Sequence, residues 1–442
     1  MAIKLTVIGG GSTRFVPTLI RLMMKSEVLG DAMVTLMDID ERRVRTMEAL
    51  AGKLIARAGA RLRVKATLDQ RESLRDADFV ITTIAAGGMD AWEKDIEIPA
   101  RYGLIMHVAD SVGPGGIMRA LRNVPILVAV ARDAAEVAPD TFIFNYANPA
   151  SAAAMALQTV PGVNSVSLCD CAWVPRNVGW LAWQAGVEPE DLAMPPVVAG
   201  INHCASIIEL RLRDGRDALA LARARAQEPI EKWALETYGV LPYCWTHWVE
   251  FHPQMQYTEE PYNGRAQGLR VRYGMRTRDI GEERGRVSRL LKLADESTRP
   301  AGGASMLTDP AHGVEDLGVE VIDIIEAIVE NRNDTRIVNT VNHGAIPNLP
   351  ADAIVEVNAS VNAYGVRPIY AGPLPEPLAA HLRQYVALQR QMVEAALSGD
   401  RQAALHAFML EPTIAARLDL DQTQALLDEM LAAHSEQLPL FS

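Results

Sequence analysis

The sequence predicts an α/β fold, with a doubly wound, mostly parallel sheet in its first part and an α+β arrangement in its second. Short apolar runs alternate with helical patterns over the first 170 residues, which is typical of βαβ units. A glycine-rich turn follows the first of these runs directly. The chain has 442 residues, of which 49% are hydrophobic and 22% charged, enough for two globular domains. We therefore expect one domain at residues 1–170 and a second at residues 171–442.

Hydrophobic periodicity predicts the elements of the first domain. The glycine turn is expected to open a helix, and further helices are expected near residues 40–58 and 117–135. Right-handed crossovers through these helices would wind the strands into a Rossmann-type sheet. The expected strands, each indicated by a short apolar or β-branched run, lie at residues 4–8, 33–37, 62–68, 78–85, 141–145 and 164–168.

The second domain shows mixed patterns. Strands are expected at residues 197–200 and 206–213, and helices at residues 282–294, 319–330, 378–397 and 422–434. The last two helices are amphipathic, and an apolar helix face needs a surface to cover it. We expect a second subunit to provide that surface, which predicts a homodimer or a homotetramer.

Composition narrows the classes of partner. The net charge of −12 argues against nucleic acid or an anionic membrane. No apolar run reaches the length of a membrane span, and the apolar run at the start is too short for a secretory leader. The four cysteines, Cys169, Cys171, Cys204 and Cys244, are too few for a disulfide framework. Together these features predict a protein of the reducing cytoplasm, but they identify no ligand.

The glycine turn after the first strand is a candidate dinucleotide site. Gly9 and Gly11 would allow a tight turn and a close approach to a pyrophosphate, and Ser12 and Thr13 complete the turn. The helix behind it would offer N–H groups to the anion. Arg14 stands where the usual motif has its third glycine, so a turn without a ligand is the alternative.

Asp38 ends the second strand, where a carboxylate can accept hydrogen bonds from the ribose hydroxyls of a nucleotide. The same carboxylate would repel a 2′-phosphate, which favours NAD over NADP. A helix cap shared with Asp40 is an alternative role that is compatible with the first.

Residues 110–122 read DSVGPGGIMRALR, and Pro114 with its neighbouring glycines predicts a loop before a helix. Such a loop at the carboxyl edge of the sheet is expected to face a ligand.

Three further elements should deliver polar side chains to the same edge. Asn148 and Pro149 follow one strand, Cys169 and Asp170 follow the next, and His203 follows a later apolar run. A thiolate with an imidazole suits a divalent transition metal. A buried cysteine and a structural histidine are the alternative reading of these residues.

Taken together these pieces resemble glycoside hydrolase family 4, and the resemblance covers most of the chain. It implies that Cys169 and His203 hold a divalent ion, usually manganese, and that Asn148 binds substrate hydroxyls. Cys171 is the rival thiol, but the Leu-Cys register favours Cys169. Asp170 matches the general acid of one subgroup. The matching stretches are VIGGGST, LMDID, DADFVITTI, ADSVGPGGIMRALRNVP, FNYANP, SLCDC, GINHCASIIEL and NHGAIPNLP.

The segment at residues 246–251 is similar to the α-galactosidase, α-glucosidase and α-galacturonidase branch. His247 is the candidate base, with contact to substrate alone as the alternative. Trp248 falls where the 6-phosphosugar branch has a base tyrosine. Glu250 is interpreted as structural, and Phe251 is shared with α-galacturonidases.

The resemblance also addresses the charge of the substrate. The 6-phosphosugar branch has an arginine where Trp92 aligns, so this site is less suited to a phosphate dianion. Arg119 is a candidate cation for the carboxylate of a uronide.

The family is an exception to the two-carboxylate scheme of glycosidases. The resemblance implies transient oxidation at sugar carbon 3, elimination of the aglycone and addition of water, with NAD and manganese as cofactors and an α-glycoside as substrate. A 6-phospho-α-glucosidase of the same family is one alternative. A lactate/malate-type dehydrogenase, which has a related fold, and a nucleotide-sensing regulator are the others.

Overall fold

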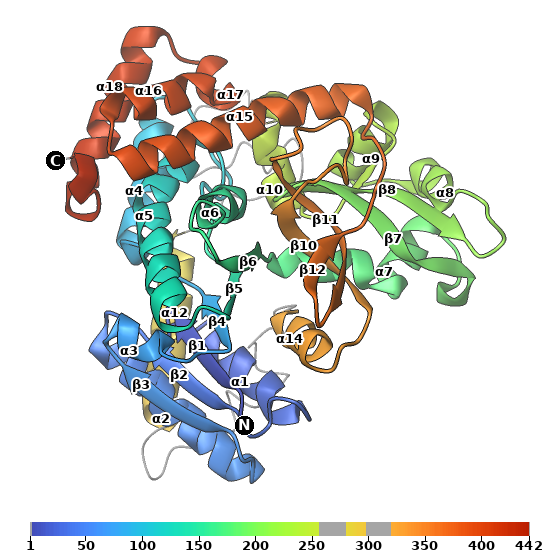
Figure 1. The fold of residues 1–442 in the computed structure, drawn as a ribbon. Coiled ribbons are helices and arrows are strands. Elements are labelled where there is room, and N and C mark those ends of the chain that lie inside the picture. The colour runs from blue at the N-terminus through green and yellow to red at the C-terminus, as the bar shows by residue number, and fades with distance from the viewer. Residues whose placement is uncertain (1, 256–279, 298–319, 442) are drawn as a thin grey trace.

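The computed structural model describes residues 2–255, 280–297 and 320–441. Its N-terminal part is the predicted Rossmann-type sheet, in which parallel strands run in the order β6-β5-β4-β1-β2-β3 (Figure 1). The expected strands are confirmed, with small differences at their ends. Their bounds are β1 Lys4–Ile8, β2 Met33–Met37, β3 Arg63–Thr67, β4 Phe79–Thr82, β5 Phe142–Asn145 and β6 Asn164–Ser167.

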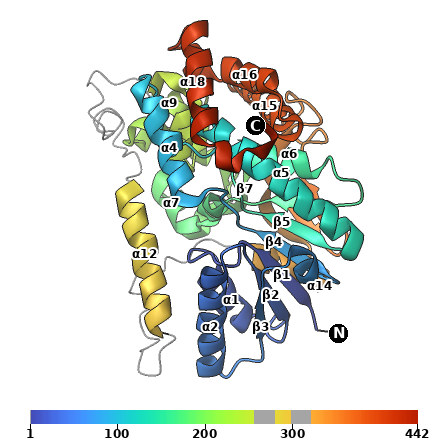
Figure 2. The same ribbon diagram turned by 90° about the vertical axis from the view of Figure 1, so that its left-hand side faces the viewer.

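Helices cover both faces of this sheet (Figure 2). Apolar side chains of α1 and α2 pack with β1 and β2 in one buried cluster, and those of α5 and α6 belong to another. The α2 helix begins where the Asp40 side chain accepts from the Arg43 N–H, and it ends at Gly59 in the left-handed conformation. The bounds are α1 Val16–Lys25, α2 Glu41–Ala58, α3 Gln70–Leu74, α4 Gly88–Arg101, α5 Gly113–Val137 and α6 Ala150–Leu157.

The prediction of a loop around Pro114 is wrong, because these residues form the first turn of α5. Proline is tolerated there, since the first helical N–H groups have no partner within the helix. A Cβ on Gly115 would lie 2.7 Å from the Asp95 carbonyl oxygen, and one on Gly116 would lie 2.5 Å from the Ser111 carbonyl carbon. The glycines therefore permit close packing against the preceding segment, and do not signal an irregular loop.

Strands from the second half of the chain extend the same sheet, which the sequence analysis did not predict. Within the described residues it has nine strands, in the order β12-β11-β10-β6-β5-β4-β1-β2-β3. β10 runs antiparallel to β6, and β11 and β12 continue antiparallel. The bounds are β10 Asp334–Val341, β11 Ile354–Asn362 and β12 Gly365–Pro368, with α14 Val321–Val329 packed beside them.

A smaller antiparallel sheet, β7-β8-β9, lies to the side of the main sheet (Figure 1). It confirms the strands expected at residues 197–200 and 206–213, although β7 begins earlier than predicted. Its elements are β7 Leu192–Ile201, β8 Cys204–Leu212 and β9 Leu241–Pro242, with α7 Val178–Ala185, α8 Ala218–Arg225, α9 Pro229–Thr237 and α10 Trp245–Trp248. Short 3-10 helices lie at η1 Asp170–Arg176, η2 Pro189–Asp191, η3 Val249–Phe251 and η4 Pro253–Met255.

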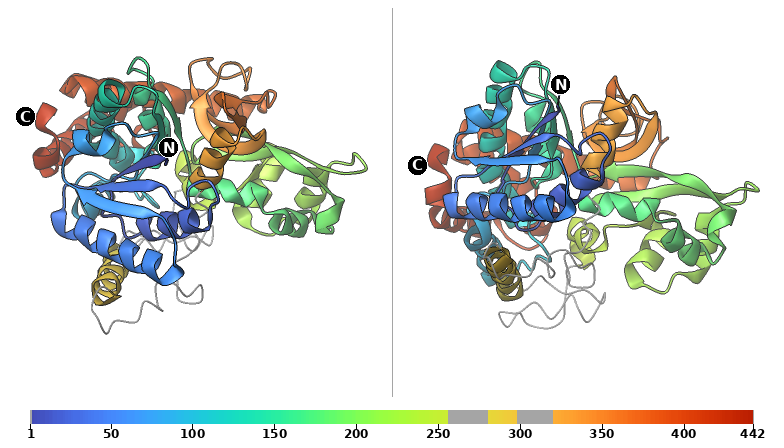
Figure 3. Two further views of the ribbon diagram at one scale, coloured as in Figure 1. Left: turned by 60° about the horizontal axis from the view of Figure 1, so that its bottom comes forward. Right: turned by 90° about the horizontal axis from the view of Figure 1, so that it is seen from below.

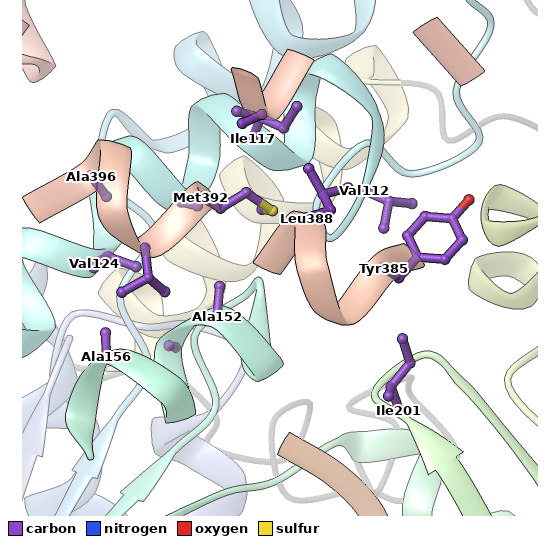
Figure 4. Close-up of a cluster of buried hydrophobic side chains, with 14 of the residues drawn as sticks. Val112, Ile117, Val124, Ala152, Ala156, Ile201, Tyr385, Leu388, Met392 and Ala396 are labelled. Carbon is purple, nitrogen blue, oxygen red and sulfur yellow. The ribbon is translucent and has the colours of Figure 1, made fainter. Parts of the chain in front are cut away.

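The C-terminal helices pack against α5 and α6. In the right-hand view of Figure 3, which is from below, they lie in red behind the blue N-terminal elements. In Figure 4, Tyr385, Leu388 and Met392 of α15 lie in one apolar cluster with Ile117 of α5 and Ala152 of α6. The amphipathic faces predicted here are therefore buried within the chain. The helices are α15 Glu376–Ser398, α16 Arg401–Leu410, α17 Pro412–Ala415 and α18 Leu420–Ala433, with η6 Ser435–Gln437 and η7 Pro439–Phe441; α12 Ile280–Ser297 lies beside α2 and α4.

Across the described part of the chain, no helix combines the length and the apolar character needed to cross a membrane.

Candidate active site

The glycine turn is held against the end of β2. The N–H groups of Gly9 and Gly10 donate to the Met37 carbonyl at 3.0 and 2.7 Å, and the Gly11 N–H donates to Asp38 Oδ2 at 2.8 Å. A Cβ on Gly11 would lie 2.9 Å from that carboxylate oxygen. The Asp38 carboxylate thus fixes the position of the turn. A glycine turn held at the carboxyl edge of the sheet is consistent with the predicted phosphate site.

Helix α1 begins only at Val16, so the turn is longer than predicted. Ser12 and Thr13 precede the helix, and the Ser12 hydroxyl accepts from the Phe15 N–H at 3.2 Å. The next residue, Arg14, reaches across to the end of β6. Its guanidinium lies 2.6 Å from a carboxylate oxygen of Asp170, and both side chains are about one third exposed.

A buried carboxylate, Asp110, connects the residues that the sequence analysis expected to meet. Asn148 Nδ2 donates to Asp110 Oδ2 at 2.9 Å, and the Ser111 hydroxyl lies 2.8 Å from Oδ1. The Nδ1 atoms of His247 and His203 lie 3.5 and 3.8 Å from Oδ1. Asp110 precedes α5, Asn148 follows β5, and the histidines come from α10 and the β7–β8 turn. Side chains from three other parts of the chain therefore meet at the Asp110 carboxylate.

The electrostatics of Asp110 favour the ionised form. Burial alone would raise its pKa, but the charges of His247, His203 and Arg119 outweigh burial and hold the pKa below its usual range. Arg119 Nη1 lies 3.8 Å from Asp110 Oδ2, and its guanidinium lies 5.6 Å from the ring centroid of Trp92. Trp92 in turn donates its indole N–H to the Val108 carbonyl at 2.7 Å, so the aromatic ring that supports Arg119 is fixed.

The donors for a metal ion lie next to this cluster. The ligand atoms of Cys169, His203 and Cys244 lie within 4.8 Å of one another, and all three residues are buried. His203 Nδ1 lies 2.7 Å from the Ser111 hydroxyl, which orients the ring and leaves Nε2 to bind a metal. Two sulfurs and an imidazole nitrogen fit a divalent transition metal. Cys171, the rival thiol, contributes its N–H to Cys169 Sγ at 3.4 Å.

His247 stacks on His203, with ring centroids 3.7 Å apart and an angle of 22° between the planes. Glu250, one helical turn further on, accepts from the N–H groups of Val108 and Ala109 at 2.6 and 2.9 Å. Burial raises the pKa of Glu250 to about 8. Because both bonds hold the backbone just before Asp110, they support the structural interpretation of Glu250.

Another buried carboxylate, Glu356 of β11, supports the site from the second half of the chain. It accepts hydrogen bonds from the Tyr243 hydroxyl and from Asn202 Nδ2, the latter at 2.8 Å. Burial raises its pKa to about 7. Asn202 precedes His203, so this network fixes the turn that presents the imidazole.

The structure thus brings together Asn148, Cys169, His203, His247 and Arg119, while Asp170 lies against Arg14. Four residues of the site were not predicted from the sequence: Asp110, Ser111, Cys244 and Glu356. Three of these have a signal in the local sequence. Asp110 and Ser111 directly precede the glycine-rich turn, and Cys244 stands three residues before His247, a spacing typical of residues on one helical face. Glu356 has no local signal, because β11 reaches the site only through the sheet.

Comparison with known families gives two matches. A model described as family 4 glycosyl hydrolase matches residues 4–177, and a model of the family 4 C-terminal domain matches residues 198–414.

Curated relatives match the chain over nearly its full length. An α-galactosidase from Bacillus subtilis is 29% identical over 446 residues, covering 99% of both chains. A Bacillus subtilis protein assigned as a 6-phospho-β-glucosidase is also 29% identical, with 99% and 98% covered. An α-galacturonidase from the same organism is 28% identical over 458 residues, with 97% of each chain covered.

Solved structures share the fold. The crystal structure of the Bacillus subtilis protein lplD, assigned as a glucosidase, has a TM-score of 0.82 at 27% identity and covers 97% of this chain and 100% of that one. A 6-phospho-α-glucosidase from gut microorganisms, in complex with NAD and Mn²⁺, has a TM-score of 0.80 at 23% identity, with 99% of both chains covered.

Proposed function

The chain belongs to family 4 of the glycosyl hydrolases, and on this premise we propose that it cleaves unphosphorylated α-hexosides with NAD and a divalent metal ion as cofactors. The observation that carries the proposal is the meeting of Asn148, His203 and His247 at the Asp110 carboxylate. Cys169 lies beside His203, and the glycine turn lies at the same edge of the sheet. A nucleotide site, metal donors and a candidate base are thus adjacent.

The glycine turn would hold NAD. The backbone of Gly9 and Gly11, with Ser12 and Thr13, would face the pyrophosphate, and Asp38 would accept from the ribose. Cys169 and His203 would hold the metal. When bound, the two cofactors supply reversible hydride transfer at sugar carbon 3 and polarisation of the resulting carbonyl. In this division residues 1–170 carry the NAD-binding turn, and residues 171–442 add the metal-binding histidine and the base.

The side chains around Asp110 would orient the sugar and move its protons. Asn148 would hold a sugar hydroxyl through its amide. His247 would take the proton from carbon 2, and Asp110 would stabilise the charge that His247 then carries. This arrangement needs His247 in its observed position against Asp110.

Asp170 is the proposed acid for the leaving group. An acid must carry its proton before donating it, whereas the ion pair with Arg14 requires the ionised carboxylate. Protonation of Asp170 would therefore replace the ion pair with Arg14 by a weaker hydrogen bond to a neutral carboxyl group.

The substrate assignment is supported by Trp92. This residue lies beneath Arg119 where the phosphosugar branch would have an arginine of its own. A dianion without a bidentate arginine would carry a heavy desolvation cost. One carboxylate needs less compensation, and Arg119 would provide it, so a uronide is the leading special case.

The test compares kcat/KM for nitrophenyl α-galacturonide, α-glucuronide, α-galactoside, α-glucoside and a 6-phosphoglucoside, with NAD and Mn²⁺ present. We expect an unphosphorylated sugar to be best, without net accumulation of NADH. A tenfold or larger preference for the phosphorylated sugar, about 1.4 kcal/mol in the transition state, would overturn the substrate assignment. Full activity after dialysis against a chelator would overturn the metal assignment.

We also propose that the protein is a homodimer or homotetramer located in the cytoplasm. The exposed side chains of Trp173 and Trp183 support an interface on the smaller sheet's side of the molecule. The four free cysteines support a reducing compartment. Light scattering at micromolar concentration tests the assembly, and a monomer would refute it.

A further inference from the structure

A third donor lies beside the proposed metal pair. We propose that Cys244 is a protein ligand of the metal ion, so that the site offers two thiolates and one imidazole. This inference rests on the proposed function, in which Cys169 and His203 bind the metal, and it adds a residue that the family resemblance did not supply.

The geometry supports a shared ion. Transition metals bind cysteine sulfur and histidine nitrogen at about 2.0–2.3 Å, so two ligands of one ion lie within about 4.6 Å of each other. The donor atoms of Cys169, His203 and Cys244 lie within 4.8 Å of one another and need only small side-chain movements. Among the described residues, Cys171 forms such a group only with Cys169 and Asp170, without a histidine.

The backbone of Cys244 also belongs to the catalytic arrangement. Its carbonyl accepts the N–H groups of His247 and Trp248 at 3.1 and 2.8 Å, which begins the helical turn of α10. The same residue therefore presents a thiol toward the metal donors and starts the turn that carries the candidate base. A metal bound to Cys244 would fix the position of His247 relative to His203.

The donor set has a chemical consequence. Two thiolates balance the charge of a divalent ion and are softer ligands than the carboxylates and water that Mn²⁺ prefers. The chain should therefore favour Co²⁺ or Zn²⁺ over Mn²⁺ more strongly than a site with one thiolate would. Cys244 is the residue that should produce this added preference.

The test is Co²⁺ binding to the metal-free full-length protein, followed by the near-ultraviolet thiolate-to-cobalt absorption, whose intensity scales with the number of bound thiolates. We expect Cys244→Ser to retain one Co²⁺ per chain with about half the wild-type intensity, because one of two thiolates is lost, and to show a smaller preference for Co²⁺ over Mn²⁺ than the wild type. Cys171→Ser and Cys204→Ser, which replace other cysteines, should keep the full intensity.

Full intensity in Cys244→Ser, or a loss in Cys171→Ser instead, would overturn the proposal. X-ray absorption of the cobalt-loaded wild-type protein counts the sulfur neighbours without any substitution, and one sulfur would also overturn it. A different result would show that Cys169 and His203 do not bind the metal at all. In that case Cys169→Ser and His203→Ala would leave the bound cobalt unchanged.

Discussion

Asp110 is the residue through which the candidate site is organised. Its two oxygens face an amide, a hydroxyl, a guanidinium and two imidazoles, all from different positions in the chain. Because the carboxylate is buried and ionised, each of these groups is held by charge as well as by packing.

Replacing Asp110 with asparagine should therefore abolish most of the activity. Asp110→Asn keeps the shape but removes the charge that stabilises protonated His247. We expect kcat/KM to fall by at least about 100-fold, the lower range for loss of acid–base assistance. Steady-state kinetics measure the loss of activity, and the melting temperature shows whether the substitution also changes stability.

The matched control is Asp133→Asn, which also removes a carboxylate from an ion pair, here with Arg71, away from the site. It should leave kcat/KM unchanged. If Asp110→Asn kept more than a tenth of the activity with a normal melting temperature, the central role of this carboxylate would be refuted.

Among the helices and strands, sequence patterns predicted best those elements whose signal lies within their own residues. The bounds of β1 and β2 match the prediction, because buried parallel strands appear as uninterrupted apolar runs. α4 and α6 were missed, since α4 contains Pro99 and α6 is apolar on every face. β10 to β12 were missed as well, although each pairs with its neighbour in the sequence. No local pattern could show that β10 also pairs with β6, which lies far back in the chain, and so joins the main sheet. The same reason explains why Glu356 could not be assigned to the site.

The first turn of α5 should not tolerate a methyl group. In Gly116→Ala the new Cβ would meet the Ser111 backbone at 2.5 Å and push Asp110 and Ser111 from their positions. We expect a loss of about 1–3 kcal/mol in the free energy of unfolding, together with a larger loss of kcat/KM. Denaturant unfolding and kinetics measure these effects.

Gly52→Ala in α2 is the matched control, because a Cβ there meets nothing within 4 Å. It should stabilise the protein by about 0.5–1 kcal/mol. Equal effects of the two substitutions would show that the close approach at Gly116 has no consequence.

Helix α9 contains a pH-dependent contact. Burial raises the pKa of Glu231 from 4.5 to about 7, while Gln184 Nε2 donates to the carboxyl at 2.7 Å. A raised pKa means that the folded state holds the proton more tightly than the unfolded chain. Its contribution to stability is therefore present below about pH 4.5 and is lost as the pH rises through 7.

Glu231→Gln keeps a neutral group at every pH. The melting temperature of the variant relative to wild type should therefore rise between pH 5 and pH 8. Thermal unfolding at several pH values measures this difference, and a difference that does not change with pH would contradict the linkage.

For the whole molecule, the main feature is that both halves of the chain share one sheet and its two cores. One apolar cluster extends from Ile8 to Leu438 and the other from Leu5 to Val361. Residues 1–170 alone would leave the edge of β6 and much apolar surface uncovered. We therefore expect calorimetry to show one cooperative transition, and two separated transitions would contradict this expectation.

The junction between β6 and β10 also matters during synthesis. β6 ends at Ser167, whereas β10 begins at Asp334. A ribosome adding 5–20 residues per second needs roughly 8–35 s to make the intervening chain. Throughout that interval the nascent sheet presents an open edge, which can pair with other chains. Recombinant production should therefore gain from chaperones that shield this edge until the last strands emerge.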